Sequence, residues 1–516
     1  MKLNLKDTFN QELPADSVTE NYVRQVFNAA FSYVTPKIPG NPKLIHASPQ
    51  MIEAIGLTEI EAKSEDFLNA FSGKEVFPDT NPYAMCYGGH QFGNWAGQLG
   101  DGRAINLFEV NQNEQQWALQ LKGSGKTPYS RGADGLAVLR SSVREYLCSE
   151  AMFHLGVPTT RALSLVLTGD EVLRDMLYNG NAAYEKGAIV CRVAPSFIRF
   201  GNFQIFAWRE DFENLKKLTD YTIRHFYPHL GEPNKETYIE FFREIVGKTL
   251  DLIIHWERVG FVHGVMNTDN MSILGLTIDY GPYGWLEDYD PNWTPNTTDA
   301  GQKRYRYGNQ AAIGLWNLLQ LGNALFPLIQ DAKPLEEILD SYQINYLPKH
   351  ICMMSDKLGL KTEVEADLII ELEQLLYQSE MDLTLFFRNL NKFDENNPSA
   401  FWTILQESSY STNLEILQDK WTQFLQTYAE ILIAENREKK ERTEVMNGVN
   451  PKYVLRNYMA QLAIDAADED DFSIVDELFN LLLKPYDEQP EAEKWFAKRP
   501  DWAKEKVGCS MLSCSS

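Results

Sequence analysis

Residues 263–281 read HGVMNTDNMSILGLTIDYG, and this stretch decides the fold class. It follows an amphipathic pattern over residues 236–259 that predicts one long helix. Within it, His263 and Asn270 stand seven residues apart, and the segment Asp279-Tyr280-Gly281 comes shortly after them. An amide oxygen and a carboxylate are hard ligands that suit Mg²⁺, so the stretch predicts a loop that binds a metal ion.

The order of these elements is that of a protein-kinase catalytic centre. Kinases place a His and an Asn seven residues apart in the catalytic loop and a metal-binding Asp-x-Gly after a short hairpin. Here residues 271–278, with Gly275 at the centre, predict that hairpin. An ordinary turn and hairpin would not account for the whole series, so Asn270 and Asp279 are candidate Mg²⁺ ligands.

One position departs from the kinase pattern. The catalytic Asp of a kinase stands two residues after the His, where this chain has Val265, which accepts no proton. Asp269, beside Asn270, is the substitute base. Two interpretations remain open at this point: an inactive relative of kinases, or an enzyme with a different transfer geometry.

A predicted strand ends at a second candidate residue, Lys122. Residues 104–110 and 115–122 predict a β-hairpin, and apolar residues at helical spacing predict a helix from Leu136 to Leu155. A lysine at a strand end is often only a surface charge. In kinases the equivalent lysine binds phosphate and is held by a helix glutamate, which predicts Glu145 as its partner.

Glycines precede this hairpin at Gly97, Gly100 and Gly102. Glycine lets a backbone approach a phosphate closely, but the same residues also form ordinary turns. The run matches neither the P-loop pattern nor a correctly placed Gly-x-Gly-x-x-Gly, so the glycines alone are weak evidence for a nucleotide.

Arg192 and Arg199 lie among apolar residues, and a buried arginine needs an anionic partner. Structural ion pairs or a bound triphosphate would both supply one. The formal net charge of −24 repels nucleic acid, anionic membranes and ATP alike. We therefore expect no nucleic-acid or membrane partner, and a nucleotide site here needs a local group of cations.

Composition is that of a soluble globular protein, with 44% hydrophobic and 23% charged residues. There is no run of 18 apolar residues, and the start of the chain resembles neither a secretory signal nor a transit peptide. Six scattered cysteines give neither a disulfide framework nor zinc spacing. These features predict a cytoplasmic protein.

The predicted fold class is α+β, because strands come first and helices follow. We expect a kinase-like, two-lobed fold with a small α+β N-lobe and a large, mainly helical C-lobe. In the last part of the chain, Asn450 and Pro451 predict the start of a helix over residues 451–467. The expected divisions are an N-terminal extension (1–75), the N-lobe (76–205), the C-lobe (206–445) and a helical extension with a cysteine-containing tail (446–516).

Several long stretches together resemble the selenoprotein O family. They extend the match almost from end to end: HQFG at 90–93, QLGDGR at 98–103, LKGSG at 121–125, LRSSVREY at 139–146, PTTR at 158–161, residues 263–282, Asn450-Pro451, Arg456-Asn457 and the closing SCSS at 513–516. Motifs of this length make a chance match implausible.

The resemblance implies a protein nucleotidyltransferase that binds ATP in the reverse orientation to a kinase. It would attach AMP to Ser, Thr or Tyr hydroxyls of proteins and release pyrophosphate. It implies that Asp269 is the general base, that Asn270 and Asp279 bind Mg²⁺, and that Glu145 orients Lys122. The implied nucleotide-binding residues are Gly100, Gly102, Arg103, Lys122, Asp134, Gly135, Arg192, Arg199 and Asp279.

The chain departs from the family pattern at a few positions. Leu136 stands where the family often has Arg, and Phe197 stands where it often has His. Cys514 occupies the selenocysteine position, which some members are implied to pair with a cysteine shortly after Asp-Tyr-Gly. This chain has no cysteine between Cys191 and Cys352. A redox role for Cys509 or Cys514 stays open.

Three functions compete. AMP transfer is the leading one, with UMP transfer and Mn²⁺ as its variant. Phosphoryl transfer by the same fold is disfavoured by Val265. A catalytically dead scaffold that binds ATP would have no need for Asp269, Asn270 and Asp279 together.

Overall fold

The computed structural model describes residues 1–176, 180–362, 364–509 and 511–513, so Cys514 lies outside the described residues. A seven-stranded antiparallel sheet forms the centre of the first two hundred residues, in the order β1-β3-β6-β7-β9-β8-β2. Its strands are β1 (Phe31–Tyr33), β2 (Lys43–Ala47), β3 (Tyr83–Met85), β6 (Ala104–Gln112), β7 (Gln115–Lys122), β8 (Arg161–Arg174) and β9 (Ala183–Ala194). Residues 1–75 thus supply both edge strands, β1 and β2.

The predicted hairpin that ends at Lys122 is confirmed as β6 and β7. The turn residues Asn113 and Glu114 both have positive φ, 52° and 64°, as a two-residue turn between twisted strands requires. Gln112 pairs with Gln115 across this turn, and Ala104 pairs with Lys122 at the other end. The register therefore places Lys122 at the end of a central strand.

The predicted helix after Leu136 is also confirmed, as α5 (Leu139–His154). It packs against β8 and β9, and Gly156, with a φ of 72°, follows its end. Short helices α1 (Phe9–Glu12), α2 (Pro49–Ala54), α3 (Glu59–Ala62) and α4 (Glu65–Phe71) complete this sheet-rich part.

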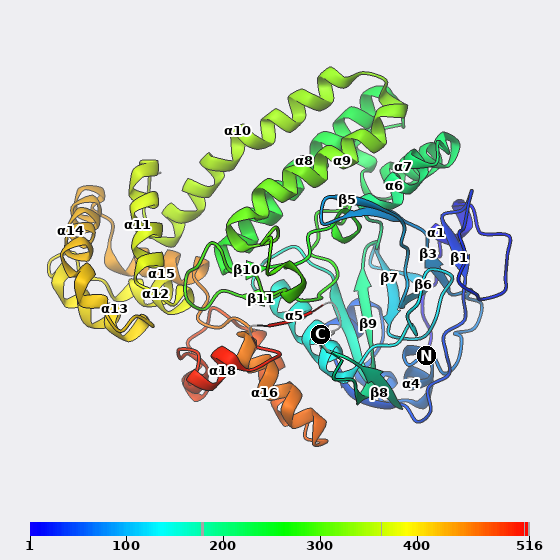
Figure 1. Cartoon of the computed structure of the whole chain (residues 1–516), viewed down its shortest axis with the longest axis horizontal. Helices are drawn as coiled ribbons and strands as arrows, with labels where there is room; N and C mark the ends of the chain where they lie inside the picture. The colour runs from blue at the N-terminus through cyan, green and yellow to red at the C-terminus, as the bar shows by residue number, and fades with distance from the viewer. Residues whose placement is uncertain (177–179, 363, 510, 514–516) are drawn as a thin grey trace.

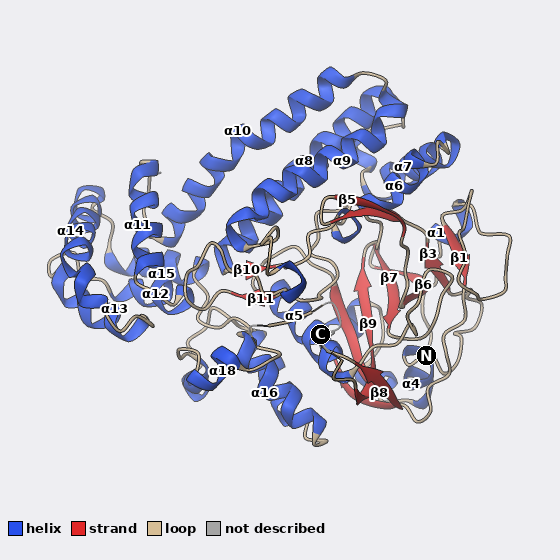
Figure 2. Ribbon diagram, viewed as in Figure 1, coloured by secondary structure: helices blue, strands red, loops and turns tan. Residues whose placement is uncertain are grey.

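The rest of the chain is mainly helical, and Figure 2 shows most strands gathered in one lobe, with the short pair β10 and β11 apart from it and most helices outside it. Its helices are α6 (Phe200–Trp208), α7 (Phe212–Phe226), α8 (Lys235–Val259), α9 (Gln310–Ile329), α10 (Ala332–Lys357), α11 (Ala366–Gln378), α12 (Leu383–Asn389), α13 (Trp402–Ser408), α14 (Gln418–Glu435), α15 (Lys439–Val449), α16 (Asn457–Asp468), α17 (Ser473–Leu482) and α18 (Asp501–Glu505). The predicted α+β fold with a small sheet-rich part and a helical part is confirmed.

The long helix before the catalytic loop forms as predicted. Asn234 caps α8 by accepting a hydrogen bond from the Thr237 amide, and Gly260 ends it in the left-handed conformation with a φ of 75°. In Figure 1, α8, α9 and α10 lie side by side as the longest helices, and they contact one another. The strand pair β10 (Phe261–Val262) and β11 (Gly284–Trp285) then brackets the catalytic loop.

One segment, Tyr307–Ile329, is long and apolar enough to cross a membrane by length and composition. It contains α9, and half of its apolar window is buried inside the protein. Because α9 packs against α6, α8 and α10, contacts within the fold account for its apolar character.

Two local predictions are wrong. Residues 271–278 form a turn at Gly275 rather than a hairpin, because Ser272 bridges to Arg199 and Thr277 bridges to Thr159 instead of to each other. The helix predicted from Pro451 begins at Asn457. The amides of Lys452 and Tyr453 both donate to the Pro485 carbonyl, so a tertiary contact takes the place of the first helical turn.

Candidate active site

Lys122 lies at the centre of a buried group of charges. Its Nζ is 2.6 Å from Oε2 of Glu145 on α5 and 2.8 Å from Oδ1 of Asp279. The Lys122 side chain is only 7% exposed. The predicted partnership of Lys122 with Glu145 is therefore present in the structure, and Asp279 joins it.

Arg192 on β9 enters the same group. Its Nη1 lies 3.2 Å from Oε1 of Glu145 and 3.2 Å from Oδ1 of Asp279. Its Nη2 donates to Oε1 of Gln120 on the neighbouring strand, and its guanidinium lies over the ring of Phe197, 5.2 Å from the centroid. Phe197, which departs from the family pattern, thus packs against Arg192, a candidate phosphate-binding residue.

Arg199, the N-cap residue of α6, connects this group with the catalytic loop. Its Nη1 donates to the Asp269 carbonyl (2.7 Å), to Oδ2 of Asp279 (3.0 Å) and to Oδ1 of Asn270 (3.4 Å). The side-chain oxygens of the two predicted metal ligands, Asn270 and Asp279, therefore both point toward the positively charged Nη1 of Arg199. The side-chain amide nitrogen of Asn270 donates to the Val265 carbonyl 3.0 Å away, and this hydrogen bond fixes the side chain.

Asp279 is the shared acceptor of three cations. Its side chain is 28% exposed, and its partial removal from water raises the pKa of its carboxyl, but Lys122, Arg199 and Arg192 outweigh that effect and hold the pKa well below its usual range. The residue has a φ of 69°, a conformation that non-glycine residues adopt rarely and mostly at special sites. Asp279 is therefore a carboxylate at neutral pH, as a metal ligand must be.

Asn270 and Asp279 together fit Mg²⁺. No group of three or more His, Cys, Asp or Glu residues with metal-binding geometry occurs in the described ranges. Mg²⁺ keeps several waters and commonly takes only one or two protein oxygens beside substrate phosphates. The oxygens of Asn270 and Asp279 converge on the positive charge of Arg199, so this pair supplies the donor chemistry that such an ion needs.

Asp269 is almost fully buried, with 7% exposure. Burial raises the pKa of its carboxyl to about 6, against the opposing effect of Arg199. Its Oδ2 accepts a hydrogen bond from Nε2 of Gln91 at 3.2 Å, and its Oδ1 has no hydrogen-bond partner among the described residues. One free oxygen and a pKa near neutrality are properties of a general base.

His263 has a structural place in this arrangement. Its Nε2 donates to the Ile278 carbonyl 3.1 Å away, and its Nδ1 accepts from the Val265 amide. Burial lowers the pKa of His263, so the neutral ring ties the catalytic loop to the strand-like segment before Asp279. Val265 is itself buried, and no carboxylate stands at its position.

The predicted glycines Gly100 and Gly102 are both enclosed by Tyr129. A Cβ at Gly100, which has a φ of 80°, would lie 2.4 Å from the ring, and one at Gly102 would lie 3.0 Å from the Tyr129 carbonyl. Close packing thus requires these glycines even without a ligand. The side chain of Arg103 is partly exposed and has no ion-pair partner within the ranges that the structure describes.

Asp134 and Gly135 are held apart from the charged group. Asp134 forms two 2.8 Å hydrogen bonds with Arg174 on β8, and it shares no hydrogen bond or ion pair with Lys122, Arg192 or Arg199 in the described part of the chain. Gly135 has a φ of 74°, and a Cβ there would lie 2.1 Å from the Gly125 carbonyl. The loop that carries both residues is therefore fixed by its own contacts.

Sequence reasoning missed three residues that contact this site. Gln91 was part of a quoted motif but received no role, and Gly89, beside it, lies against Asp269. Gln120 was seen only as part of a strand, although it contacts Arg192. The alternation of the strand, which points Gln120 and Lys122 to the same face, could have indicated Gln120.

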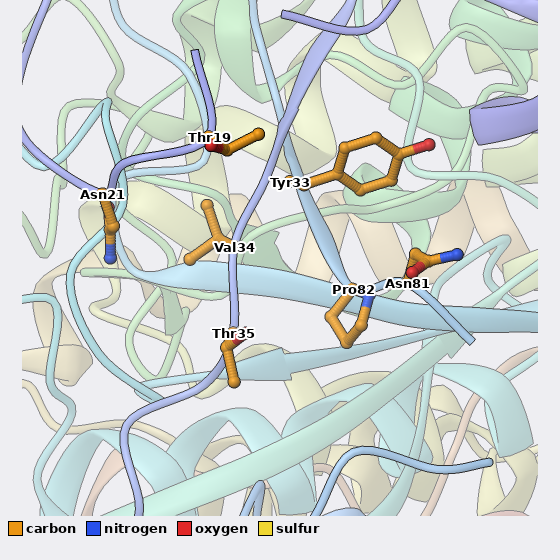
Figure 3. A pocket seen from close by; sticks show the side chains of 7 residues that line it. All are labelled: Thr19, Asn21, Tyr33, Val34, Thr35, Asn81 and Pro82. Atoms are coloured by element: carbon orange, nitrogen blue, oxygen red, sulfur yellow. The ribbon is translucent and has the colours of Figure 1, made fainter. Parts of the chain in front are cut away.

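A hollow of about 260 Å³ lies elsewhere on the sheet-rich part (Figure 3). It is lined by Thr19, Asn21, Tyr33, Val34, Thr35, Asn81 and Pro82. None of these seven side chains is charged, and none of the predicted site residues lines the hollow. It therefore offers no match to the triphosphate that the charged group suits.

The chain matches the family model described as protein adenylyltransferase SelO over residues 16–483. It is 60% identical to protein nucleotidyltransferase YdiU of Flavobacterium johnsoniae over 526 aligned positions, which cover 100% of this chain and 99% of the relative. It is 54% identical to the protein of that name from Methylobacillus flagellatus, with 100% of both chains covered. The chain therefore belongs to the SelO family of protein adenylyltransferases.

Proposed function

We propose that this chain transfers AMP from ATP to Ser, Thr or Tyr hydroxyls of proteins, with Mg²⁺, and releases pyrophosphate. Membership of the SelO family supports the nucleotidyl transfer, and the 60% identical relative has a name that states nucleotidyl transfer to protein. UTP and Mn²⁺ are the alternative nucleotide and metal. Neither the kinase nor the scaffold alternative is favoured by the family.

The observation that carries the proposal is the position of Arg199. A single guanidinium nitrogen contacts the Asp269 carbonyl, the Asn270 amide oxygen and the Asp279 carboxylate. The candidate base, the candidate metal ligands and a candidate phosphate-binding cation therefore lie within reach of one nucleotide. Val265 leaves the usual kinase position without a base, which favours attack at a different phosphorus.

In the proposed step, Asp269 accepts the proton of the acceptor hydroxyl through its free Oδ1. The hydroxyl oxygen forms a bond to the α-phosphorus, the bond from that phosphorus to the α,β-bridging oxygen breaks, and pyrophosphate leaves. Arg192 and Arg199 stabilise the charge that builds on the leaving group. Lys122, held by Glu145, binds a further phosphate oxygen.

Asn270 and Asp279 would hold the Mg²⁺ ion, which would neutralise phosphate charge and polarise the phosphorus. Gly100, Gly102, Arg103, Asp134 and Gly135 are the remaining nucleotide-binding residues of the proposal. Of these, Arg103 has the side chain best suited to contact a phosphate, since it is partly exposed and makes no ion pair in the described ranges. The glycines would contribute backbone amides.

We further propose the division into an N-lobe at 76–205 and a C-lobe at 206–445, with ATP bound between them and the extension at 446–516 supporting the C-lobe. Lys122 and Arg192 come from the first segment and Asp269 and Asp279 from the second. A cytoplasmic location agrees with Cys86, Cys148 and Cys191, which are buried thiols outside any disulfide.

Labelled ATP tests the reaction directly. With casein as acceptor, label on the α-phosphate should become attached to protein, and label on the γ-phosphate should leave as pyrophosphate. Protein labelled from the γ-position would identify a kinase, and binding of ATP with no turnover would identify a scaffold. Parallel reactions with UTP in place of ATP, and with Mn²⁺ in place of Mg²⁺, show which nucleotide and which metal give the higher transfer rate.

A further inference from the structure

A small hairpin from the sheet-rich part lies on the catalytic loop. It consists of β4 (Gly88–Gln91) and β5 (Asn94–Gln98), joined by a two-residue turn, and it is separate from the main sheet. Figure 1 shows β5, in blue, reaching across to the green helices α6 and α9. β4 packs against α6 and against η2 (Thr268–Asn270), the 3-10 turn that carries Asp269.

Three consecutive hairpin residues each bind one residue of the catalytic loop. The His90 amide donates to Oγ1 of Thr268 at 2.7 Å, and the Phe92 amide donates to Oδ1 of Asn267 at 3.2 Å. Between them, Nε2 of Gln91 donates to Oδ2 of Asp269 at 3.2 Å. The loop therefore lies in a fixed register against the hairpin.

Side chains around the hairpin hold it in this place. The ring of His90 lies between Trp95 of β5 and Trp316 of α9, with centroids 5.1 Å and 5.4 Å away. Gln204 on α6 accepts from Thr268 and contacts Nδ1 of His90. Because these contacts come from α6, α9 and the catalytic loop together, the hairpin is anchored to the helical part.

The two carboxylate oxygens of Asp269 differ in their hydrogen bonding. Oδ2 is held by Gln91, whereas Oδ1 has no hydrogen-bond partner in the described ranges. Gly89 lies against that second oxygen: a Cβ at this position would be 2.8 Å from Oδ1 and 2.9 Å from the Asp269 Cβ. These distances are shorter than a side-chain carbon tolerates, so only a glycine at position 89 lets the hairpin backbone approach the Asp269 carboxylate this closely.

We propose that the β4–β5 hairpin positions Asp269 for proton transfer, with Gln91 fixing Oδ2 and Gly89 allowing the hairpin backbone to pack directly against the carboxylate. Gln91 is a positioning residue, because it acts through Asp269 and not on ATP. The inference rests on the proposed role of Asp269 as the base. It assigns a role in the transfer step to a part of the chain that is distant in sequence from residues 263–281.

Substitutions in the hairpin test this role through the turnover of bound ATP. Turnover is followed as pyrophosphate release from ATP and Mg²⁺ with casein present, which counts transfer to casein, to the chain itself and to water. Gln91→Leu removes the donor and should lower kcat about tenfold, with the Kd for ATP within about twofold of the parent. Gln91→His keeps a donor and should recover part of the loss.

Gly89→Ala should lower kcat at least as much as Gln91→Leu, because the new methyl group must displace either the Asp269 carboxylate or the hairpin. Asn94→Ala is the matched control: Asn94 is exposed at the hairpin turn, and among the described residues its side-chain amide donates to the Phe92 carbonyl alone. It should turn over like the parent chain. Thermal melting identifies any variant that fails to fold.

Unchanged kcat in Gln91→Leu, or equal losses in kcat and ATP affinity, would overturn the inference. Asp269→Asn separates this failure from that of the proposed function. If Asp269→Asn is inactive while Gln91→Leu is normal, only the role of the hairpin is wrong. If Asp269→Asn retains full turnover, Asp269 is not the base, and both proposals fall.

Discussion

The Nζ atom of Lys122 lies 2.8 Å from Oδ1 of Asp279, although 157 residues separate them in the sequence. This contact joins the end of β7 to the segment that carries a proposed metal ligand. Glu145 completes the arrangement by contacting Lys122 from α5 at 2.6 Å. The three residues form one electrostatic unit, and substitutions within it should not act independently.

A double-mutant cycle on Lys122 and Glu145 measures this coupling. Lys122→Ala and Glu145→Gln should each reduce the rate of AMP transfer, and the double variant should lose less than the two single losses added together. We expect a coupling of about 0.5–3 kcal/mol in the activation free energy, the range for residues in direct contact. Strict additivity would mean that Glu145 does not act through Lys122.

Asp279→Ala should abolish Mg²⁺-supported transfer, because it removes the only carboxylate of the proposed metal pair. It should also lower the free energy of unfolding by about 1–3 kcal/mol, since Lys122, Arg192 and Arg199 lose their shared acceptor. Activity assays across a Mg²⁺ titration and chemical denaturation provide the two measurements.

Asp170→Ala is the control for this substitution, because Asp170 is about as exposed as Asp279 and also pairs with a lysine, Lys37, but contacts none of the proposed site residues among the described contacts. It should leave the metal dependence unchanged. If Asp279→Ala responds to Mg²⁺ as the parent chain does, Asp279 is not a metal ligand.

The pH dependence of transfer should follow Asp269. A base must be ionised to accept a proton, and burial raises the pKa of this carboxyl to about 6. The rate should therefore rise with pH and level off above about pH 7, with a midpoint at or below about 6 because bound Mg²⁺ favours the ionised form. A kcat/KM profile from pH 5 to 8 checks this, and a flat profile would exclude Asp269 as the titrating group.

Glu109 should make the fold less stable as pH rises. Burial raises its pKa to about 7 from a usual value of 4.5, so the folded state binds a proton more tightly than the unfolded state does. The stabilisation is present in full below pH 4.5 and is lost as pH rises through about 7. Glu109→Gln stays neutral and should avoid this loss.

Melting curves at pH 5 and pH 8 test this expectation. The drop in Tm between the two pH values should be smaller in Glu109→Gln than in the parent chain by about 2 °C or more. Glu114→Gln, at the exposed turn of the same hairpin, should leave the drop unchanged. Equal drops in all three proteins would show that Glu109 ionises alike in the folded and unfolded states.

The sequence predicted those parts of the site that depend on local periodicity or on the kinase-like order of motifs along the chain. The strand that ends at Lys122, the helix that carries Glu145, and the loop with Asp269 and Asn270 all follow from periodicity and spacing. Arg192 and Arg199 were indicated by their apolar surroundings, and the resemblance to the family then implied that they bind the nucleotide. The result is a correct fold class and a group of charges that the structure brings together around Asp279.

What the sequence could not predict depends on contacts between distant segments. Nothing near Gln91 indicates that its amide reaches Asp269, 178 residues away. The helix start at Pro451 failed for the same reason, because Pro485 binds the amides that would begin the helix. The bonds between Asp134 and Arg174 on β8 are a further contact between distant segments that the sequence does not indicate.

One nitrogen of Arg199 touches both Asn270 and Asp279. If these two residues hold the metal ion as proposed, the binding of metal and the binding of nucleotide should depend on each other. An ion arriving alone competes with the guanidinium for the same two oxygens. A triphosphate would draw the guanidinium toward the phosphate oxygens, which frees the oxygens of Asn270 and Asp279 for the ion. The ion in turn would release the guanidinium for the triphosphate. Each ligand must then raise the affinity of the other by the same factor, as linkage requires. We therefore expect the two to be taken up best as a preformed complex, and without them Lys122, Arg192 and Arg199 are paired with the carboxylates of the site itself.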